Sequence, residues 1–119
     1  MLTVKELATL ISGEVLTGND ESLENEVRVG LTCDLLSWVM ARGAAECAWV
    51  TVQTHMNVIA VAALHDMACV IMPEGIRMAE TETKKADDEG IAVITSELSA
   101  FEICGIMYKN GVLPPVESK

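Results

Sequence analysis

Apolar residues gather in four short runs that are separated by segments with helical patterns. The runs are Val27–Thr32, Trp49–Gln53, Ala68–Met72 and Ile91–Thr95. Short apolar runs of this kind predict buried strands, and helical segments between them predict right-handed crossovers between parallel neighbours. The pattern therefore predicts an α/β fold with a mostly parallel sheet of about four core strands and flanking helices, Rossmann-like in appearance.

Capping patterns mark a helix near each end of the chain. Thr3 and Glu6 form a capping box before a helix that we expect to end at Gly13, a residue suited to a left-handed C-cap. Ser99 and Glu102 repeat the capping box before the last helix. The apolar face of that last helix is expected to bury Phe101, Cys104, Met107 and Tyr108.

The remaining segments complete one domain over residues 1–119, with a flexible tail from about residue 112. Glu14–Thr17 is expected to form a short strand that ends at the turn Gly18–Asp20, and the acidic segment Glu21–Glu26 a solvated loop. Asp34 is a candidate N-cap for a helix over Leu35–Ala41. An exposed, charged helix is expected over Met78–Glu89.

Two of the expected helices, Leu35–Ala41 and Val58–Leu64, are apolar almost all the way round. A helix that packs on one face of a sheet needs only one apolar face, so something further must cover these two. Either a compact core or a subunit interface explains the surplus. An interface would make the protein a homodimer, and its candidate residues are Leu35, Leu36, Trp38, Val39 and Met40.

The formal net charge of −10 makes nucleic acid and anionic membranes poor partners. The first residues do not resemble a signal peptide, and polar residues interrupt the richest apolar stretch, so we expect a cytoplasmic protein with no membrane span. Four widely separated cysteines are typical of free thiols in a reducing compartment. Their spacing matches neither a zinc site nor an iron–sulfur cluster.

Polar residues concentrate where the core strands end, which is the edge at which open parallel sheets bind ligands. Neither glycine-rich nucleotide motif occurs, but free amides at the start of a helix could still hold a nucleotide or another phosphorylated metabolite. The candidate ligand-binding residues at this edge are Thr32, Asp34, Gln53, Thr54, His55, Asn57, Glu74, Thr95 and Ser96.

Other chemistry has weaker support from the sequence. Cys33 and His55 could form a nucleophile–base pair in a small enzyme, although a lone cysteine beside a strand is more often part of the core. His65 follows an apolar helix and suits a cap at its carboxyl end. His55, His65, Asp34 and Glu74 lack metal-ligand spacing on any one element, so we expect neither a metal nor a cofactor.

Three segments in succession resemble a known family, the DRTGG domain. They are VGLTCDLLSWVM at Val29–Met40, AWVTVQTHMNVIAVAALHDMACVIMPEGI at Ala48–Ile76, and GIAVITSELSAFEICGIMYKNG at Gly90–Gly111. The resemblance extends from about Gly13 to Gly111 and is strongest to free-standing copies of the domain. The chain lacks the string D-R-T-G-G itself, so no residue-level site can be transferred.

The resemblance implies a fold similar to the N-terminal domains of HPr kinase and of Mur ligases. It also implies a non-catalytic regulatory module, like those in phosphotransacetylases and in pyrophosphatases with CBS domains. The resemblance also implies dimer formation, which the apolar helices indicate independently. A redox or hydrogenase-related protein partner in an anaerobe is implied by the resemblance alone.

Overall fold

Helices and strands alternate along most of the chain, whose structure is a computed structural model that describes residues 2–17 and 20–115. In chain order the elements are α1 (Val4–Leu10), β1 (Glu14–Thr17), α2 (Asp20–Leu23), β2 (Val29–Thr32), α3 (Leu36–Arg42), β3 (Cys47–Val50), α4 (Met56–Leu64), β4 (Cys69–Met72), α5 (Glu80–Glu89), β5 (Ala92–Thr95) and α6 (Ala100–Lys109).

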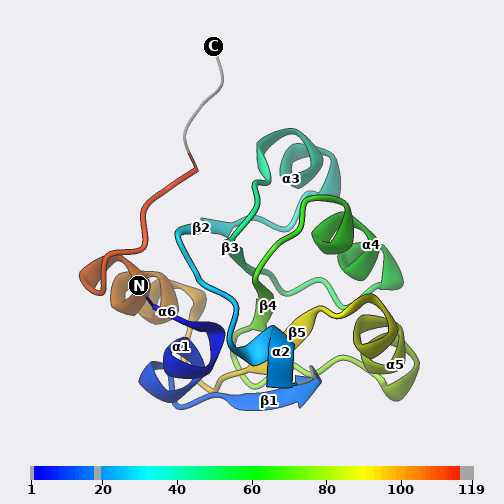
Figure 1. Cartoon of the computed structure of the whole chain (residues 1–119), viewed down its shortest axis with the longest axis horizontal. Coiled ribbons are helices and arrows are strands. Elements are labelled where there is room, and N and C mark those ends of the chain that lie inside the picture. The colour runs from blue at the N-terminus through cyan, green and yellow to red at the C-terminus, as the bar shows by residue number, and fades with distance from the viewer. Residues whose placement is uncertain (1, 18–19, 116–119) are drawn as a thin grey trace.

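The five strands form one sheet in the order β1-β5-β4-β3-β2. Strands β2 to β5 pair in parallel with their neighbours in the chain, whereas β1 pairs antiparallel with β5. The predicted α/β class and mostly parallel sheet are therefore confirmed, and β1 makes the sheet mixed. Because each crossover steps in the same direction, right-handed connections place α3, α4 and α5 on one face, as Figure 1 shows.

Both faces of the sheet are covered, with α1 and α6 on the face opposite α3, α4 and α5 (Figure 1). The side chains of β3 show the consequence, because they alternate between two separate apolar clusters. Ala48 and Val50 pack with residues of α1 and α6, while Cys47 and Trp49 pack with residues of α3 and α4. This two-sided burial explains why the strands are apolar at nearly every position.

The central position of α4 explains why that helix is apolar all the way round. It lies between α3 and α5 and also packs on the sheet, so neighbours cover three of its sides (Figure 1). Helix α3 ends the row, and α4 is its one neighbour in the layer. Val39 is buried and Leu36 partly so, but Leu35 is 62% exposed and Trp38 51% exposed.

Both predicted capping boxes are present, but the end of α1 differs from the prediction. The left-handed residue there is Ser12, with φ of 52°, and Gly13 follows it. Gly13 is needed for space instead, because a Cβ atom on it would lie 2.6 Å from Cγ2 of Ile94 and 3.2 Å from the carbonyl oxygen of Thr95. Close approach to β5 therefore accounts for this glycine.

The last helix buries Met107 as expected, but it does not bury the two aromatic residues. Ile103 and Met107 are buried under α6, whereas Phe101 is 89% exposed and Tyr108 70% exposed. The two aromatic residues lie seven positions apart on the outer face, and the sheet can cover only the inner face. The prediction that they are buried was therefore wrong, and Cys104 is intermediate.

Two expectations between the core strands also need correction. The acidic segment Glu21–Glu26 is not all loop, because its first residues belong to α2, and Ser22 is buried with its hydroxyl donating to the carbonyl oxygen of Gly90 at 3.0 Å. The turn expected at residues 18–20 lies mostly outside the described residues. Asp34 does not cap α3, whose N-cap is Leu35 and has no side-chain capping hydrogen bond.

The segment expected to begin a flexible tail instead packs on the edge of the sheet. Val112 is buried, and Leu113 forms a bridge to Val29 in which the amide of Gly30 donates to the carbonyl oxygen of Leu113 at 2.9 Å. Backbone pairing at an open edge strand explains why the chain stays on the sheet here. Within the described residues, none of the helices is both long enough and apolar enough to span a bilayer.

Exchanging the roles of Ser12 and Gly13 tests the corrected end of α1. Ser12→Gly should raise the free energy of unfolding by about 0.5–1 kcal/mol, because glycine accepts the left-handed conformation without strain. Gly13→Ala should lower it by about 1–3 kcal/mol, because the added methyl group meets β5. Urea unfolding of both variants measures the difference, and a lower free energy of unfolding for Ser12→Gly would contradict the left-handed role of Ser12.

Candidate functional site

The carboxyl ends of β2 and β3 are joined through the Asp34 side chain. Its Oδ1 atom accepts a hydrogen bond from the hydroxyl of Thr51 at 2.8 Å and another from the amide of Val52 at 2.9 Å. The side-chain amide of Gln53 donates to the Asp34 carbonyl oxygen at 3.0 Å. Two of the predicted ligand residues, Asp34 and Gln53, are thus in contact, and their hydrogen bonds make this part of the edge rigid.

The next residues lead into α4 and leave polar groups at the surface. Thr54, His55 and Asn57 are exposed, and His55 is the N-cap of α4. Its Nδ1 atom accepts a hydrogen bond from the amide of Asn57 at 3.0 Å, so the ring proton is on Nε2 when the imidazole is neutral. The amino end of α4 therefore presents a partial positive charge beside three exposed polar side chains.

Thr95 and Ser96, at the end of β5, use their hydroxyl groups within the fold. Thr95 donates to the carbonyl oxygen of Ile76 at 2.6 Å, and Ser96 donates to the carbonyl oxygen of Ile11 at 2.7 Å. The turn that contains Glu74 is bonded to the segment after β5, since the Glu74 amide donates to the carbonyl oxygen of Leu98 at 2.9 Å. These bonds close the backbone between β4 and β5, where the crossovers turn to opposite faces of the sheet.

A small cavity of about 120 Å³ lies beside Thr95 and Ser96. Arg77 borders it and donates two hydrogen bonds of 3.0 Å each to the carboxylate of Glu14. This pairing holds the pKa of Glu14 below its usual value and raises that of Arg77. The guanidinium charge is therefore already neutralised, and the cavity is too small for a nucleotide.

The nine predicted ligand residues fall in three places along the carboxyl edge. Asp34 and Gln53, with the neighbouring Thr54, His55 and Asn57, lie at the ends of β2 and β3. Glu74, Thr95 and Ser96 lie at the ends of β4 and β5. Thr32 borders a separate apolar groove of about 220 Å³ between β2, α6 and Leu113. Their role in binding stays a prediction, and the group beside α4 contains three neighbouring exposed polar residues, Thr54, His55 and Asn57.

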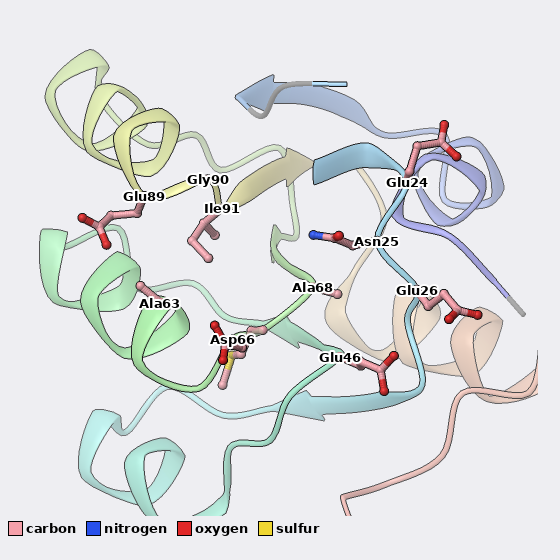
Figure 2. Close-up of a pocket in the computed structure, with 11 residues that line it drawn as sticks. Glu24, Asn25, Glu26, Glu46, Ala63, Asp66, Ala68, Glu89, Gly90 and Ile91 are labelled. Carbon is pink, nitrogen blue, oxygen red and sulfur yellow. The ribbon is translucent and has the colours of Figure 1, made fainter. Parts of the chain in front are cut away.

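A cavity of about 500 Å³ lies at the opposite edge of the sheet, where the parallel strands begin. Figure 2 shows carboxylates on its rim, contributed by segments that precede different strands. The acidic residues that border it are Glu24, Glu26, Glu46, Asp66 and Glu89. Two of these five residues form ion pairs, Glu46 with Arg28 at 3.2 Å and Glu89 with Lys85 at 3.3 Å. Acidic residues still outnumber basic ones around the cavity, so its net charge is negative.

Helix dipoles increase the difference between the two edges. The carboxyl ends of α3, α4 and α5 lie at the amino edge of the parallel strands, where the acidic cavity is. The amino ends of the same helices lie at the opposite, carboxyl edge. An anionic ligand is therefore repelled from the acidic cavity and favoured beside α4.

Sequence reasoning missed the acidic cavity, although the sequence contains a signal for it. An acidic residue stands at or just before the start of each core segment: Glu26, Glu46, Asp66 and Glu89. Because the amino ends of parallel strands meet at one edge, four such residues had to converge there. Read one segment at a time, Glu26 belongs only to a solvated loop and Glu89 only to an exposed, charged helix, so the convergence is not visible.

The four cysteines are free, and two of them, Cys47 and Cys69, are buried. Burial raises the pKa of Cys47 to about 12, and it also raises the pKa values of Cys69 and Cys104. Thiols with raised pKa values are weak nucleophiles. His65 ends α4 as expected, and its Nε2 atom also reaches the carbonyl oxygen of Met40 in α3 at 3.0 Å.

Catalytic and metal chemistry gain no support from the described contacts. Cys33 bonds through its sulfur to the carbonyl oxygen of Leu35, and the Nδ1 atom of His55 is engaged with Asn57. Within the described residues no three His, Cys, Asp or Glu side chains are grouped so that they could hold a metal ion.

Comparison with known proteins identifies the fold. No protein-family model matches the chain, and no curated protein is significantly similar to it in sequence. The structure is similar to that of the CBS and DRTGG domains of the regulatory region of Clostridium perfringens pyrophosphatase, solved in complex with its activator, diadenosine tetraphosphate. The TM-score is 0.75 at 14% sequence identity, and the match covers 94% of this chain and 47% of that one.

At this level of identity the likeness concerns the fold, and it confirms the DRTGG-like fold that the sequence resemblance implies. The chain spans about half the length of the matched regulatory region. That region is regulatory rather than catalytic by its description.

Removing the Asp34 carboxylate tests whether it holds the ends of β2 and β3 together. Asp34→Ala should lower the free energy of unfolding by about 1–3 kcal/mol, because the buried hydroxyl of Thr51 and the amide of Val52 lose their acceptor. Asp88→Ala, at an exposed position in α5, is the matched control and should change it by less than about 0.5 kcal/mol. Equal urea midpoints for the two variants would contradict this role.

Proposed function

We propose that the chain is a non-catalytic regulatory module that senses a small anionic ligand, a nucleotide or another phosphorylated metabolite, at the carboxyl edge of its sheet. The observation that carries the proposal is the likeness to a regulatory region that was solved with a nucleotide activator. The charge distribution supports the same edge, because the opposite edge carries the acidic cavity.

The proposed contacts are the exposed residues next to the amino end of α4: Thr54, His55 and Asn57. Asp34 and Gln53 would act as a rigid support for them, because their hydrogen bonds join the ends of β2 and β3. The His55 ring caps the Asn57 amide, but the amino end of α4 still carries the partial positive charge of the helix dipole, which suits a phosphate group even in an acidic protein.

Self-association through α3 is the second part of the proposal. Leu35, Trp38 and Met40 are exposed on this terminal helix of the layer, and the guanidinium of Arg42 lies 5.1 Å from the centre of the Trp38 ring. An apolar surface of this kind favours contact with another protein surface. The cytoplasmic location and the redox or hydrogenase-related partner belong to the same proposal, and the free thiols support the former.

A ligand panel tests the sensing function. Adenosine mononucleotides, ATP and diadenosine tetraphosphate are added to the full chain, and the melting temperature is followed as concentration rises. A ligand at 100 times its Kd should stabilise the native state by about 2.7 kcal/mol. Thr54→Ala and Asn57→Ala should weaken binding by about tenfold, as expected for the loss of one polar contact.

The control for this panel is Glu26→Gln, at the acidic edge, which should leave the affinity unchanged or slightly higher. Absence of any shift with every ligand would refute the proposed ligand class. If Glu26→Gln changes the affinity and the α4 variants do not, the ligand binds at the acidic amino edge of the sheet and the proposed site is wrong.

The α3 surface is tested by the mass of the protein in solution. Leu35→Ser with Trp38→Ser should convert the associated form to a smaller one in light scattering, because both side chains would leave the contact. Leu64→Ser, at an exposed leucine of α4, is the matched control and should keep the wild-type mass. A wild-type mass for the double variant would remove α3 from the interface.

A further inference from the structure

The outer face of α6 has an unusual composition for a solvated surface. Phe101 and Tyr108 are exposed there, one turn before and about one turn after an exposed glycine, Gly105. No heavy atom lies within 4 Å of the position that a Cβ atom on Gly105 would take. Packing inside the chain therefore does not explain why a glycine stands in the middle of this helix, where it lowers helix stability relative to alanine.

The positions around Gly105 divide into two rows. A helix turns by about 100° per residue, so Phe101 and Tyr108 lie along one side of Gly105. Glu102 and Lys109 lie along the other side by the same geometry. The result is a flat strip with a glycine at its centre, an aromatic row on one side and a row with one negative and one positive residue on the other.

The aromatic row borders a hollow in the surface. Tyr108 and Cys104 line the apolar groove of about 220 Å³ that also contains Leu31 and Leu113. Phe101, which is the most exposed of the large apolar residues described, lies on the same side of α6. A protruding ring and an apolar hollow are thus carried by one continuous face.

We propose that this face binds a second copy of the chain, with the two α6 helices antiparallel and crossing at Gly105. The missing side chains at the crossing allow the two backbones to approach closely, as small residues do where helices pack. A two-fold axis at this point makes the contact isologous, so each copy offers the same surface to the other.

Antiparallel pairing matches both rows. The two-fold axis keeps the aromatic rows on the same side, so Phe101 of one copy faces Tyr108 of the second copy, beside the mouth of its groove. On the other side Glu102 faces Lys109 of the second copy, and the pair occurs twice by symmetry. A parallel arrangement would instead set the aromatic row of each copy against the charged row of the other, so Glu102 would face Phe101 and no opposite charges would pair. The antiparallel arrangement is therefore favoured.

Charge complementarity is also the reason to name a second copy as the occupant. With a net charge of −10, two copies repel each other over most of their surface. The α6 strip holds one acidic and one basic residue, so its own charges cancel and an antiparallel copy satisfies both. A single helix with its flanking groove falls at the small end of specific interfaces, so we expect micromolar affinity.

The contact does not depend on the proposed ligand or on the α3 surface, because α6 covers the opposite face of the sheet (Figure 1). If both α3 and α6 contacts form, the protein makes assemblies larger than a dimer. The two contacts are tested separately: Leu35→Ser with Trp38→Ser changes the mass only if the α3 contact forms, and Gly105→Glu changes it only if the α6 contact forms.

The decisive variant is Gly105→Glu, whose effects on folding and on association have opposite signs. A side chain at this position meets nothing in the monomer and improves helix propensity, so the variant should unfold at the same or a higher temperature when dilute. In the dimer it places two negative side chains at the crossing. Sedimentation equilibrium should show a Kd raised at least about 100-fold.

Ala60→Glu is the matched control, because it adds the same charge at an exposed position on α4. It should leave the Kd within about threefold of the wild-type value. Equal weakening by both variants would overturn the proposal, since it would show a general effect of net charge. A wild-type protein that remains monomeric at about 100 µM, or a Gly105→Glu protein that associates normally, would also overturn it.

A charge exchange tests the antiparallel geometry itself. Lys109→Glu should raise the Kd about tenfold, because Glu102 of each copy then faces a glutamate of the other copy. The symmetry makes this repulsion occur twice. Adding Glu102→Lys to Lys109→Glu restores opposite charges across the axis and should recover most of the affinity. The capping box is lost in this double variant, so its helical content is checked by circular dichroism. A double variant as weak as Lys109→Glu alone would exclude this pairing.

Discussion

Burial of four parallel strands on both faces is the constraint on which the rest of this structure depends. Parallel strands need crossovers, and crossovers that always step in the same direction place three consecutive helices on one face. The other face must then be covered by α1 and α6, which come from the two ends of the described chain. The middle helix of the row of three, α4, becomes a core element, whereas α3 at the end of the row keeps an uncovered side.

The same connectivity gives the sheet two chemically different edges. Each parallel strand begins after an acidic residue and after the carboxyl end of a helix, so charges and dipoles add at the amino edge of these strands. Each parallel strand ends before the amino end of a helix, and Asp34, Thr95 and Ser96 at these ends form hydrogen bonds to backbone groups. The larger cavity therefore lies at the amino edge, whereas the positive ends of the helix dipoles lie at the carboxyl edge. An anionic ligand is favoured at the carboxyl edge, because the acidic residues repel it from the cavity.

Much of the fold could be predicted from the sequence, because two-sided burial leaves a strong local pattern. The apolar runs located β2 to β5, and the capping boxes at Thr3 and Ser99 located the starts of α1 and α6. The errors concern features that depend on distant contacts. Asp34 is a residue type suited to an N-cap, but its carboxylate instead accepts hydrogen bonds from Thr51 and Val52, which follow β3. Gly13 is a residue type suited to a C-cap, but its small size is required by the close approach of β5.

The candidate site was harder to predict for a related reason. The strand ends could be aligned along one edge, but only the structure shows that Thr95 and Ser96 use their hydroxyl groups internally while Thr54 and Asn57 remain free. Phe101 likewise shows that tertiary contacts decide whether a residue is buried, because it was expected in the core and is exposed. Helical periodicity shows which residues share a face, but whether the sheet or the solvent lies against that face depends on the tertiary fold. An aromatic residue on the solvent side is then informative, because no internal packing accounts for it.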